Sequence, residues 1–553
     1  MKNYKTVLLV FVISFLSCTS NKVKNESVPI TPEQYRRPEN YKSQNYQYSL
    51  NELKDRFSEE MMKKAAGVYE HVRKVNEEGR WKPTAESIDR HQAPEWFLDA
   101  KFGMFIDWGP WSVAGWSPKR ETGAMYTDWY EYRMERVAAF KSYHAKNWGK
   151  DFKRDDFITL FQARDYEPEK LVGIAKQAGM KYVVPFCKHH AGYCLWPSSF
   201  TRRNCVEMGP KRDLMQPLVE SCKKEGLKFG FYFSIDEWEY PLIGDDNKIK
   251  PRLWGYGEAS HRNLDGQNPL ALTDMESRAS GKIAVRDFAK DYLVPQATEF
   301  IDRYDPDLIW YDGQWAMDVT ESKSQEIVAY LYNKAEGRKE VAVNDRYGRG
   351  LRSRLGDFFT SEYHDLKNNA KGTCHPWEEC RGISQSFGFH WQDTEGNIIS
   401  SKAFIEMFLD IVSRGGNLLL IVNLDGQGAL PEIQKKRLEE IGEWLSVNGE
   451  GIYGTRMYST TSEGPARYTR SKDNKKVYAI TTIWPGKSLE LKSVIPGKGT
   501  EIHLLGDKEP LKWSYDQSNG ITTVEMPDRL QEASKWPCKY AYAFRIETED
   551  KSK

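Results

Sequence analysis

The sequence predicts an α/β fold, in which a (β/α)8 TIM-like barrel is followed by a C-terminal antiparallel β-sandwich. Two observations predict this arrangement. Amphipathic helical patterns alternate with short apolar runs, and each run ends in polar residues, as parallel strands do when their carboxyl ends share one face. After Asn448-Gly449-Glu450 the helical patterns stop, and short alternating runs separated by Gly, Pro and Asp indicate a small all-β domain.

The helix–strand units recur along most of the chain. Helices expected over Glu167 to Ala178 and Leu214 to Glu225 each end at a glycine and precede strands from Tyr182 to Phe186 and from Lys228 to Ser234. Further strands are expected at Lys101 to Gly109, Leu308 to Tyr311, Val341 to Val343, Phe358 to Thr360 and Asn417 to Val422. About eight such strands make a closed barrel, the number that (β/α)8 folds contain.

These patterns divide the chain into four segments. We expect a lipoprotein signal peptide at residues 1–18, a tether and N-terminal helical segment at 19–90, the catalytic barrel at 91–453 and the β-sandwich at 454–553. A helix over Leu50 to Val75 is expected to pack on the outside of the barrel. In the last segment Trp484, Trp513 and Trp536 are candidates for sugar binding, although the favoured interpretation is that they pack in the core of the β domain.

The first residues have the pattern of a targeting segment. Lys2 and Lys5 precede an apolar run from Val7 to Leu16 and then Ser17-Cys18, which is typical of a bacterial lipoprotein signal. Cleavage before Cys18 would leave a lipidated cysteine. The expected location is therefore exported and lipid-anchored, in the periplasm or at the cell surface, with ordinary secretion as the alternative.

Composition narrows the function further. The formal net charge is +1, so nothing favours nucleic acid as a partner, and membrane contact is expected through the lipid anchor alone. Aromatic residues make up 13% of the chain, an excess that suits stacking on sugars as well as a large core. Seven cysteines remain besides Cys18, too scattered for a disulfide scaffold. The sequence does not indicate the oligomeric state.

Polar residues at the strand ends form the candidate site. Asp312 directly follows the Leu308 to Tyr311 strand, where barrels carry catalytic groups, so it is a candidate nucleophile for sugar chemistry. An acid that caps the next turn is the alternative. The other strand ends supply Asp107-Trp108, Lys188-His189-His190 and Asp236-Glu237-Trp238, and Arg346 and Glu378 complete the set. Cys187 and Cys194 flank the histidines without a usual zinc spacing, so we expect no metal and no cofactor.

A family resemblance covers the whole barrel in order. The chain resembles the α-L-fucosidases of glycoside hydrolase family 29, most specifically in Lys188-His189-His190 followed by Leu195-Trp196-Pro197-Ser198. The matching stretches are Lys101 to Trp108, Thr127 to Met134, Tyr182 to Ser198, Gly226 to Ser234, Asp307 to Trp315, Val343 to Tyr347, Gly356 to Tyr363, Trp377 to Gly388 and Gly415 to Tyr453.

The resemblance implies a retaining exo-glycosidase that removes terminal α-L-fucose from oligosaccharides or glycoconjugates. It implies Asp312 as nucleophile and Glu378 as acid/base, with Glu379 and Glu362 as the fallback acids. It also implies that sugar hydroxyls are bound by His189 and His190, that Arg346 keeps Asp312 ionised, and that Trp108 and Trp129 line the pocket. A structural role for both histidines remains open.

Three residues depart from the family pattern. Where this chain has Asp107, Asp128 and Ala191, the family usually has His, Glu and Asp, respectively. Asp107, Asp128, Trp238 and the residues above form the expected substrate-binding set. These departures put the exact sugar in question more than the reaction, because a site built for particular hydroxyls rejects sugars that leave its groups unpaired. The alternatives are a related sugar such as an α-L-galactoside, or a non-catalytic glycan-binding lipoprotein.

Overall fold

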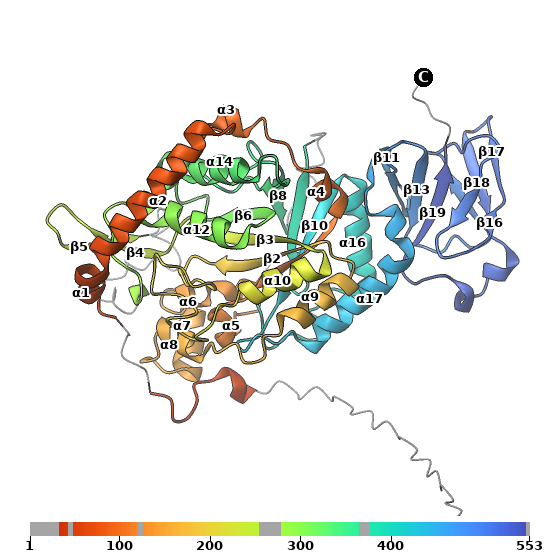
Figure 1. The fold of residues 1–553 in the computed structure, drawn as a ribbon. Helices are drawn as coiled ribbons and strands as arrows, with labels where there is room; N and C mark the ends of the chain where they lie inside the picture. The colour runs from red at the N-terminus through yellow and green to blue at the C-terminus, as the bar shows by residue number, and fades with distance from the viewer. Residues whose placement is uncertain (1–31, 43–47, 120–124, 254–277, 364–374, 549–553) are drawn as a thin grey trace, which may run out of the picture.

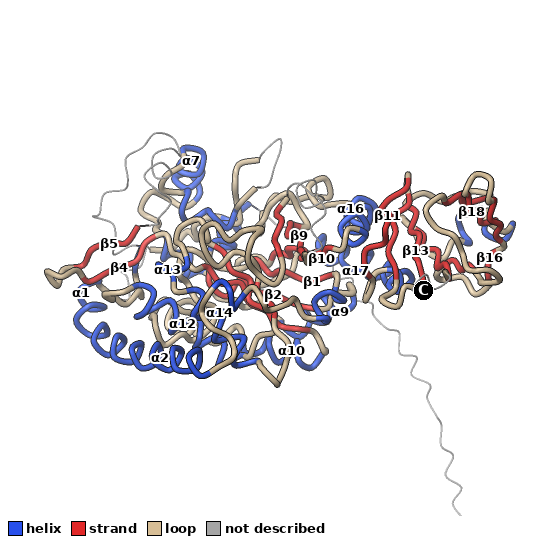
Figure 2. The backbone as a smooth tube through the Cα atoms, turned by 90° about the horizontal axis from the view of Figure 1, so that it is seen from above, coloured by secondary structure: helices blue, strands red, loops and turns tan. Residues whose placement is uncertain are grey.

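The computed structural model describes residues 32–42, 48–119, 125–253, 278–363 and 375–548, so Cys18 and the expected signal peptide lie outside the described residues. The described chain forms two lobes, a large one built around a barrel and a small all-β one (Figures 1 and 2). The last barrel helix, α17 (Glu432–Asn448), ends shortly before the first strand of the small lobe, β11 (Arg456–Glu463).

The large lobe contains a barrel of parallel strands in chain order, which confirms the predicted fold class. Its strands are β1 (Phe102–Asp107), β2 (Tyr182–Lys188), β3 (Lys228–Ser234), β6 (Leu308–Asp312), β7 (Ala342–Val343), β8 (Phe359–Glu362), β9 (Trp377–Gly382) and β10 (Gly416–Asn423). The sheet runs β7-β6-β3-β2-β1-β10-β9-β8, so β10 pairs with β1. A parallel bridge between Asn344 and Phe358 joins its two ends and closes the barrel.

Helices surround the barrel on the outside (Figure 1). The principal ones are α9 (Pro168–Gln177), α10 (Gln216–Glu225), α12 (Val294–Tyr304), α14 (Ser324–Ala335), α16 (Ser401–Ser413) and α17. The long N-terminal helix α2 (Ser58–Glu78) lies across α12 and α14. Between β1 and β2 come the short helices α5 (Trp111–Ala114), η3 (Thr127–Trp129), α6 (Tyr130–Arg133), α7 (Ala138–Asn147) and α8 (Arg154–Leu160). A hairpin of β4 (Glu239–Ile243) and β5 (Ile249–Leu253) follows β3.

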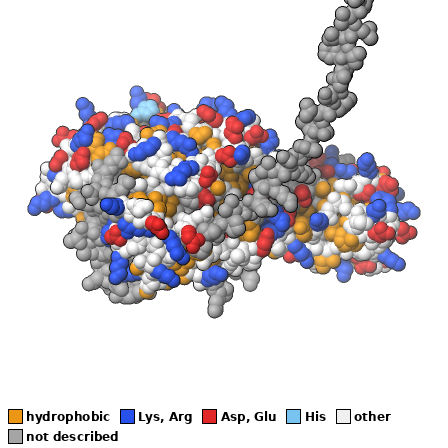
Figure 3. Space-filling view, turned by 90° about the horizontal axis from the view of Figure 1, so that it is seen from below, with side chains coloured by type: hydrophobic (Ala, Val, Ile, Leu, Met, Phe, Trp, Pro, Cys, Tyr) orange, Lys and Arg blue, Asp and Glu red, His pale blue; other side chains and the backbone are white. Residues whose placement is uncertain are grey.

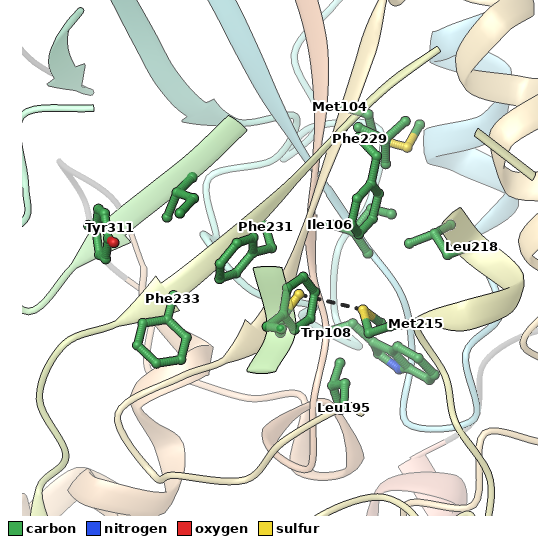
Figure 4. Packing of buried hydrophobic residues seen from close by; sticks show 14 of the residues in the cluster. Met104, Ile106, Trp108, Leu195, Met215, Leu218, Phe229, Phe231, Phe233 and Tyr311 are labelled. Atoms are coloured by element: carbon green, nitrogen blue, oxygen red, sulfur yellow. Dashed lines mark hydrogen bonds between the residues drawn. The ribbon is translucent and has the colours of Figure 1, made fainter. Parts of the chain in front are cut away.

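Alternation along each strand divides the barrel residues between two cores. Phe105 and Trp310 belong to the core inside the barrel. Their neighbours Ile106 and Tyr311 belong to the larger core between the barrel and its helices (Figure 4). Because successive side chains of a strand point to opposite faces, the parity of a residue decides whether it can reach the barrel mouth.

Strand β9 is the barrel strand that the sequence pattern did not predict. Its sequence, Trp-Glu-Glu-Cys-Arg-Gly, contains no apolar run, yet it pairs with β8 and β10 in the middle of the sheet. Because β9 begins at Trp377, Glu378 is not a loop residue at a strand end. It is the second residue of a buried strand.

The small lobe is an antiparallel β-sandwich. Six strands pair in the order β11-β12-β13-β19-β15-β16, and three pair in the order β14-β18-β17. The bounds are β12 (Ala466–Arg470), β13 (Lys476–Thr481), β14 (Ser488–Leu491), β15 (Ile502–Leu504), β16 (Pro510–Leu511), β17 (Trp513–Asp516), β18 (Ile521–Glu525) and β19 (Tyr542–Glu547).

Part of the expected tether lies on the barrel lobe. Tyr35 is buried and its ring stacks on Trp391 at 5.6 Å between centroids, while Arg37 pairs with Asp151 at 2.7 Å. Residues 32–42 are therefore docked rather than extended away from the lobe. Within the described residues no helix is long and apolar enough to cross a membrane, and the described cysteines are all free thiols.

Candidate active site

A cavity of about 210 Å³ opens at the carboxyl ends of the barrel strands. Asp312 and Glu362, the last residues of β6 and β8, both line it. The remaining wall consists of Tyr126, Asp128, Trp129, Arg133, Phe186, His189, Tyr232, Trp310, Trp315, Arg346 and Phe387. This position is where (β/α)8 enzymes place their chemistry, because eight strand ends can each contribute a side chain to one mouth.

Asp312 is held by donors from neighbouring strands. The Tyr232 hydroxyl, from β3, donates to Asp312 Oδ2 at 2.8 Å, and His190 Nε2 lies 3.6 Å from the same oxygen. The other oxygen, Oδ1, accepts from Arg346 Nη1 at 3.4 Å. The Asp312 side chain retains 13% exposure, so an oxygen fixed by these contacts still faces the cavity.

Arg346 connects Asp312 to a second carboxylate. Its Nη1 donates to Glu362 Oε2 at 3.0 Å, and its Nε donates to the Thr360 hydroxyl at 2.8 Å. Because both carboxylates contact the same nitrogen, the separation between Asp312 Oδ1 and Glu362 Oε2 cannot exceed the sum of these two contact distances. Retaining glycosidases need carboxyl groups about 5–5.5 Å apart. The pair Asp312 and Glu362 meets that requirement in outline.

Glu362 also has its own support and its own access to solvent. Its Oε1 accepts from the Tyr126 hydroxyl at 3.0 Å, and its side chain is 20% exposed. It was named from the sequence only as a fallback acid. Its position at the end of a strand that begins with apolar residues could have favoured it. The same position at a strand end identified Asp312 as a candidate.

The structure does not bring Glu378 to this cavity. Glu378 is fully buried inside the barrel, where Oε1 accepts from Trp310 Nε1 at 3.0 Å and Oε2 accepts from the Tyr182 hydroxyl. Glu378 lies two residues before Cys380 on β9, and Cys380 pairs in register with Glu362 of the cavity wall. Glu378 is therefore beneath the cavity, enclosed behind Trp310. Burial raises the pKa of Glu378 to about 8, so its carboxyl group is protonated at neutral pH.

Asp128 and His189 form the part of the wall rich in unpaired polar atoms. Asp128 Oδ2 lies 3.6 Å from His189 Nε2, while Asp128 Oδ1 and His189 Nδ1 have no hydrogen-bond partner among the described residues. Burial lowers the pKa of His189 well below its usual value, so the imidazole is neutral. Leaving buried polar atoms unpaired costs about 1–3 kcal/mol each, and a sugar hydroxyl would recover that cost.

Asp107 lies behind Asp128. It is fully buried and does not line the cavity, although its Oδ1 accepts from Trp111 Nε1 at 2.8 Å. A Cβ at Gly388 would lie 3.0 Å from Asp128 N and 3.4 Å from Asp107 Oδ1, so the Asp107 carboxyl group lies near the Asp128 backbone. Burial raises the pKa of Asp107 to about 7. The pKa of Asp128 is also raised, mainly by burial and then by the charge of Asp107. The two carboxyl groups therefore resist double ionisation.

Two further expected pocket residues, besides Asp107, lie outside the wall. Trp108 follows Asp107 and so has the opposite parity; its ring packs on Phe161 and Tyr166 in the outer core, near Met215 in Figure 4. Trp238 is buried behind Trp129, with ring centroids 5.5 Å apart. The expected residues that the structure does bring to the wall are Asp128, Trp129, His189, Arg346 and Asp312, with His190 just behind Asp312.

Tyr232 and the aromatic floor of the cavity are functional features that the sequence did not predict. Tyr232, Phe186 and Trp310 point into the barrel and form the inner wall with Phe387, which follows β9. Inward parity from Ser234 or Asp312 could have identified the strand residues. The described residues contain no group of three or more His, Cys, Asp or Glu side chains placed to hold a metal ion.

Carboxylates paired in this way cleave glycosidic bonds, with one attacking carbon and the other transferring a proton. The class of protein that the fold and site define is therefore a glycoside hydrolase. The family model for alpha-L-fucosidase matches residues 68–450, and the model for the alpha-L-fucosidase C-terminal domain matches residues 459–547. The chain belongs to the α-L-fucosidase family, glycoside hydrolase family 29.

Similar proteins extend over most of the chain. Plasma alpha-L-fucosidase of Rattus norvegicus is 33% identical over 473 residues, covering 84% of this chain and 93% of its own. Tissue alpha-L-fucosidase of Bos taurus is 31% identical over 470 residues, covering 84% and 91%. Among solved structures, Thermotoga maritima alpha-fucosidase in complex with a mechanism-based inhibitor has 30% identity and a TM-score of 0.67, covering 85% of this chain and all of that one.

Proposed function

We propose that the protein removes terminal α-L-fucosyl residues from glycans by double displacement, with Asp312 as nucleophile and Glu362 as acid/base. The observation that carries this proposal is the contact of Arg346 Nη1 with both carboxylates, at 3.4 Å to Asp312 and 3.0 Å to Glu362. The role we expected for Glu378 passes to Glu362, because Glu378 is enclosed in the barrel. Thermotoga maritima alpha-fucosidase has also been solved in complex with fucose, which supports the choice of sugar.

The proposed reaction has two steps. In the first, an Asp312 oxygen forms a bond to the anomeric carbon while the bond to the leaving oxygen breaks, and Glu362 gives its proton to that oxygen. In the second, Glu362 takes a proton from water, whose oxygen attacks the anomeric carbon and releases Asp312. Tyr232 and Arg346 hold Asp312 in position throughout. Two inversions give net retention at the anomeric carbon.

The cavity wall favours a 6-deoxy sugar. Phe186, Tyr232, Trp310 and Phe387 supply an apolar aromatic surface, which suits a methyl group and offers little to an additional hydroxyl. Asp128 and His189 supply unpaired acceptor and donor positions for ring hydroxyls. We therefore favour an α-L-fucoside over an α-L-galactoside, which differs by a hydroxyl at C6.

Azide rescue tests both roles in one experiment. In Asp312→Ala, azide can enter on the side vacated by the nucleophile, so the product expected is β-L-fucosyl azide. In Glu362→Ala, azide attacks the fucosyl-enzyme from the other side, so the product expected is α-L-fucosyl azide. NMR of the products distinguishes them. The reverse assignment, or α-azide from Glu378→Ala in place of Glu362→Ala, would overturn the proposal, and an inactive wild type would favour the non-catalytic glycan-binding reading.

We also propose that the chain is exported and anchored by lipid at Cys18. Lys2, Lys5 and the apolar run from Val7 to Leu16 support this proposal. Expression of the full chain with radiolabelled palmitate in a bacterial host should label it, and Cys18→Ala should abolish the label and shift the protein from the membrane fraction. Equal labelling of both would contradict the anchor, and release of both to the medium would indicate ordinary secretion.

A further inference from the structure

A second concave site lies on the small lobe, away from the barrel mouth. It is a groove of about 1000 Å³, several times the volume of the active-site cavity. Residues from both sheets line it. They come from β11, from the turn between β12 and β13, from the segment after β14, and from β17. A groove of this volume can hold several sugar units, whereas the barrel cavity holds one.

The charged side chains that line this groove are all basic. Arg470, Lys492 and Lys498 contribute to the lining, and no Asp or Glu among the described residues does so. Arg470 donates to the backbone carbonyls of Met457 and Ser471, at 3.0 and 3.2 Å, so it is oriented without being neutralised. Among the described residues the Lys492 side chain forms no ion pair. Basic groups gathered without acids raise the local concentration of anions.

This charge is local rather than a property of the whole surface. The chain has a formal net charge of +1, and on the face drawn in Figure 3 basic and acidic side chains are interspersed over both lobes. Acids close to the lining residues do not line the groove themselves. Glu463 accepts from the Lys492 backbone N–H at 2.8 Å, Asp473 from the Ser471 hydroxyl at 2.6 Å and Asp516 from the Ser518 hydroxyl at 2.7 Å.

Aromatic rings from two strands also line the groove. Trp513 and Tyr515 are two residues apart on β17, so both face the same way, and both are half-buried. Trp513 Nε1 donates to the Thr500 carbonyl at 2.9 Å, and the Tyr458 hydroxyl donates to the Ser493 carbonyl at 3.1 Å. These bonds fix ring edges while the rings remain part of the groove wall. Fixed aromatic rings offer apolar faces on which sugars can stack.

The three tryptophans that the sequence offered as sugar-binding candidates have different roles. Trp484 and Trp536 stack on each other, with centroids 4.6 Å apart, and both pack edge-on against Tyr542. They belong to packing within the lobe. Trp513 alone of the three lines the groove.

We propose that this groove binds an anionic glycan chain, with sulfate or carboxylate groups on Arg470 and Lys492 and sugar faces on Trp513 and Tyr515. Arg can bind either anion through two parallel hydrogen bonds, and Lys adds a point charge. A glycan is favoured over a nucleic acid because the adjoining lobe is a glycoside hydrolase. The site would hold an anionic polymer near the barrel while the cavity processes its terminal sugars.

Binding is measured with polymers that the barrel does not hydrolyse, so the outcome is independent of the proposed catalysis. Isothermal titration of the full chain with dextran sulfate, polygalacturonate and neutral dextran separates sulfate, carboxylate and uncharged chains. We expect one or both charged chains to bind and neutral dextran not to bind. The double variant Arg470→Glu with Lys492→Glu should weaken binding by at least about tenfold, as loss of charged hydrogen bonds predicts.

The matched control reverses two exposed lysines outside the groove, Lys487 and Lys512, on the same lobe. We expect this control to bind as the wild type does, and Tyr515→Ala to weaken binding without changing its salt dependence. Turnover of an aryl fucoside and the melting temperature should stay unchanged in the groove variants. Equal losses in both charge reversals, no binding of either charged chain, or tighter binding of single-stranded DNA would each overturn the proposal.

Discussion

Glu362 and Glu378 lie two residues apart in register on adjoining strands of the barrel. Thr360 of β8 is paired with Glu378 of β9, and Glu362 is paired with Cys380. Two residues along a strand correspond to roughly 6–7 Å, and here that step separates the cavity wall from the barrel interior. Glu362 reaches the guanidinium that also contacts Asp312, whereas Glu378 reaches Trp310 and Tyr182.

The first prediction compares these two acids by isosteric substitution. Glu362→Gln removes the proton donor, so kcat/KM on a fucosyl disaccharide should fall by roughly 10²–10⁴-fold, the usual contribution of general acid catalysis. On an aryl fucoside with an activated leaving group the fall in kcat/KM should be much smaller, because such a group departs without a proton. Glu378→Gln should leave both substrates within a few-fold of wild type.

Thermal melting of both variants serves as the control for folding. The dependence on the leaving group is the decisive measurement, since a structural defect would lower turnover of both substrates alike. If Glu378→Gln showed that dependence and Glu362→Gln did not, the assignment of the acid would be reversed.

Much of the fold was predictable because most barrel strands are apolar runs in the sequence. Strand β9 did not, because its inward Glu378 is tolerated only through bonds from Tyr182 and Trp310, which lie far away in the sequence. A buried acid with partners on other strands cannot be distinguished from a loop acid by local pattern. Glu378 was expected as the acid/base from the family resemblance, and nothing in the local pattern of β9 contradicts that expectation.

The candidate site was predictable where strand ends and parity agree. Asp312 closes its strand and points inward, and the structure places it in the cavity wall. Trp108 could have been excluded by counting from Phe105, whose inward position makes Asp107 inward and Trp108 outward. Arg346 was expected beside Asp312 from the resemblance, but its contact with Glu362 was not predicted, because it depends on the spatial closeness of three different strand ends.

The second prediction concerns the donor to the nucleophile. Tyr232→Phe removes the hydroxyl that donates to Asp312 Oδ2 at 2.8 Å. A hydrogen bond to a charged group contributes about 1.5–3 kcal/mol, so kcat should fall by roughly tenfold to a hundredfold while KM changes little. Tyr311→Phe is the matched control, because Tyr311 points to the outer core. Equal effects of the two variants, or a change in KM alone, would argue against this role.

The third prediction is a pH dependence that arises at Asp107. Its pKa is raised to about 7, so its proton is held below neutrality and lost as pH rises through that value. Loss of this proton places a negative charge beside Asp128, at the wall expected to bind sugar hydroxyls. Arg133 partly offsets the charge at Asp128, and Glu362 adds to it. We therefore expect KM for an aryl fucoside to rise between about pH 6 and 8.

Asp107→Asn tests this cause directly, since its amide stays neutral and its oxygen can still accept from Trp111. The KM of this variant should be nearly independent of pH over the same interval. A wild-type KM that is flat, or a variant KM that keeps the wild-type slope, would show that the proton lies elsewhere.

The last prediction concerns stability and the buried Glu378. Its folded pKa of about 8 lies above its ordinary value of 4.5. Between these values the unfolded chain releases the proton that the folded chain retains, so the fold loses stability as pH rises across this window. Glu378→Gln has no such proton, and its amide oxygen can still accept from Trp310 Nε1. The melting temperature of this variant minus that of wild type should therefore increase from pH 5 to pH 8.

Because buried Glu131 and Asp107 also have raised pKa values, the difference between the two proteins is the quantity to follow. Glu439→Gln, on the exposed side of α17, should give a flat difference. A flat difference for Glu378→Gln as well would mean that this carboxyl group is already ionised in the folded barrel.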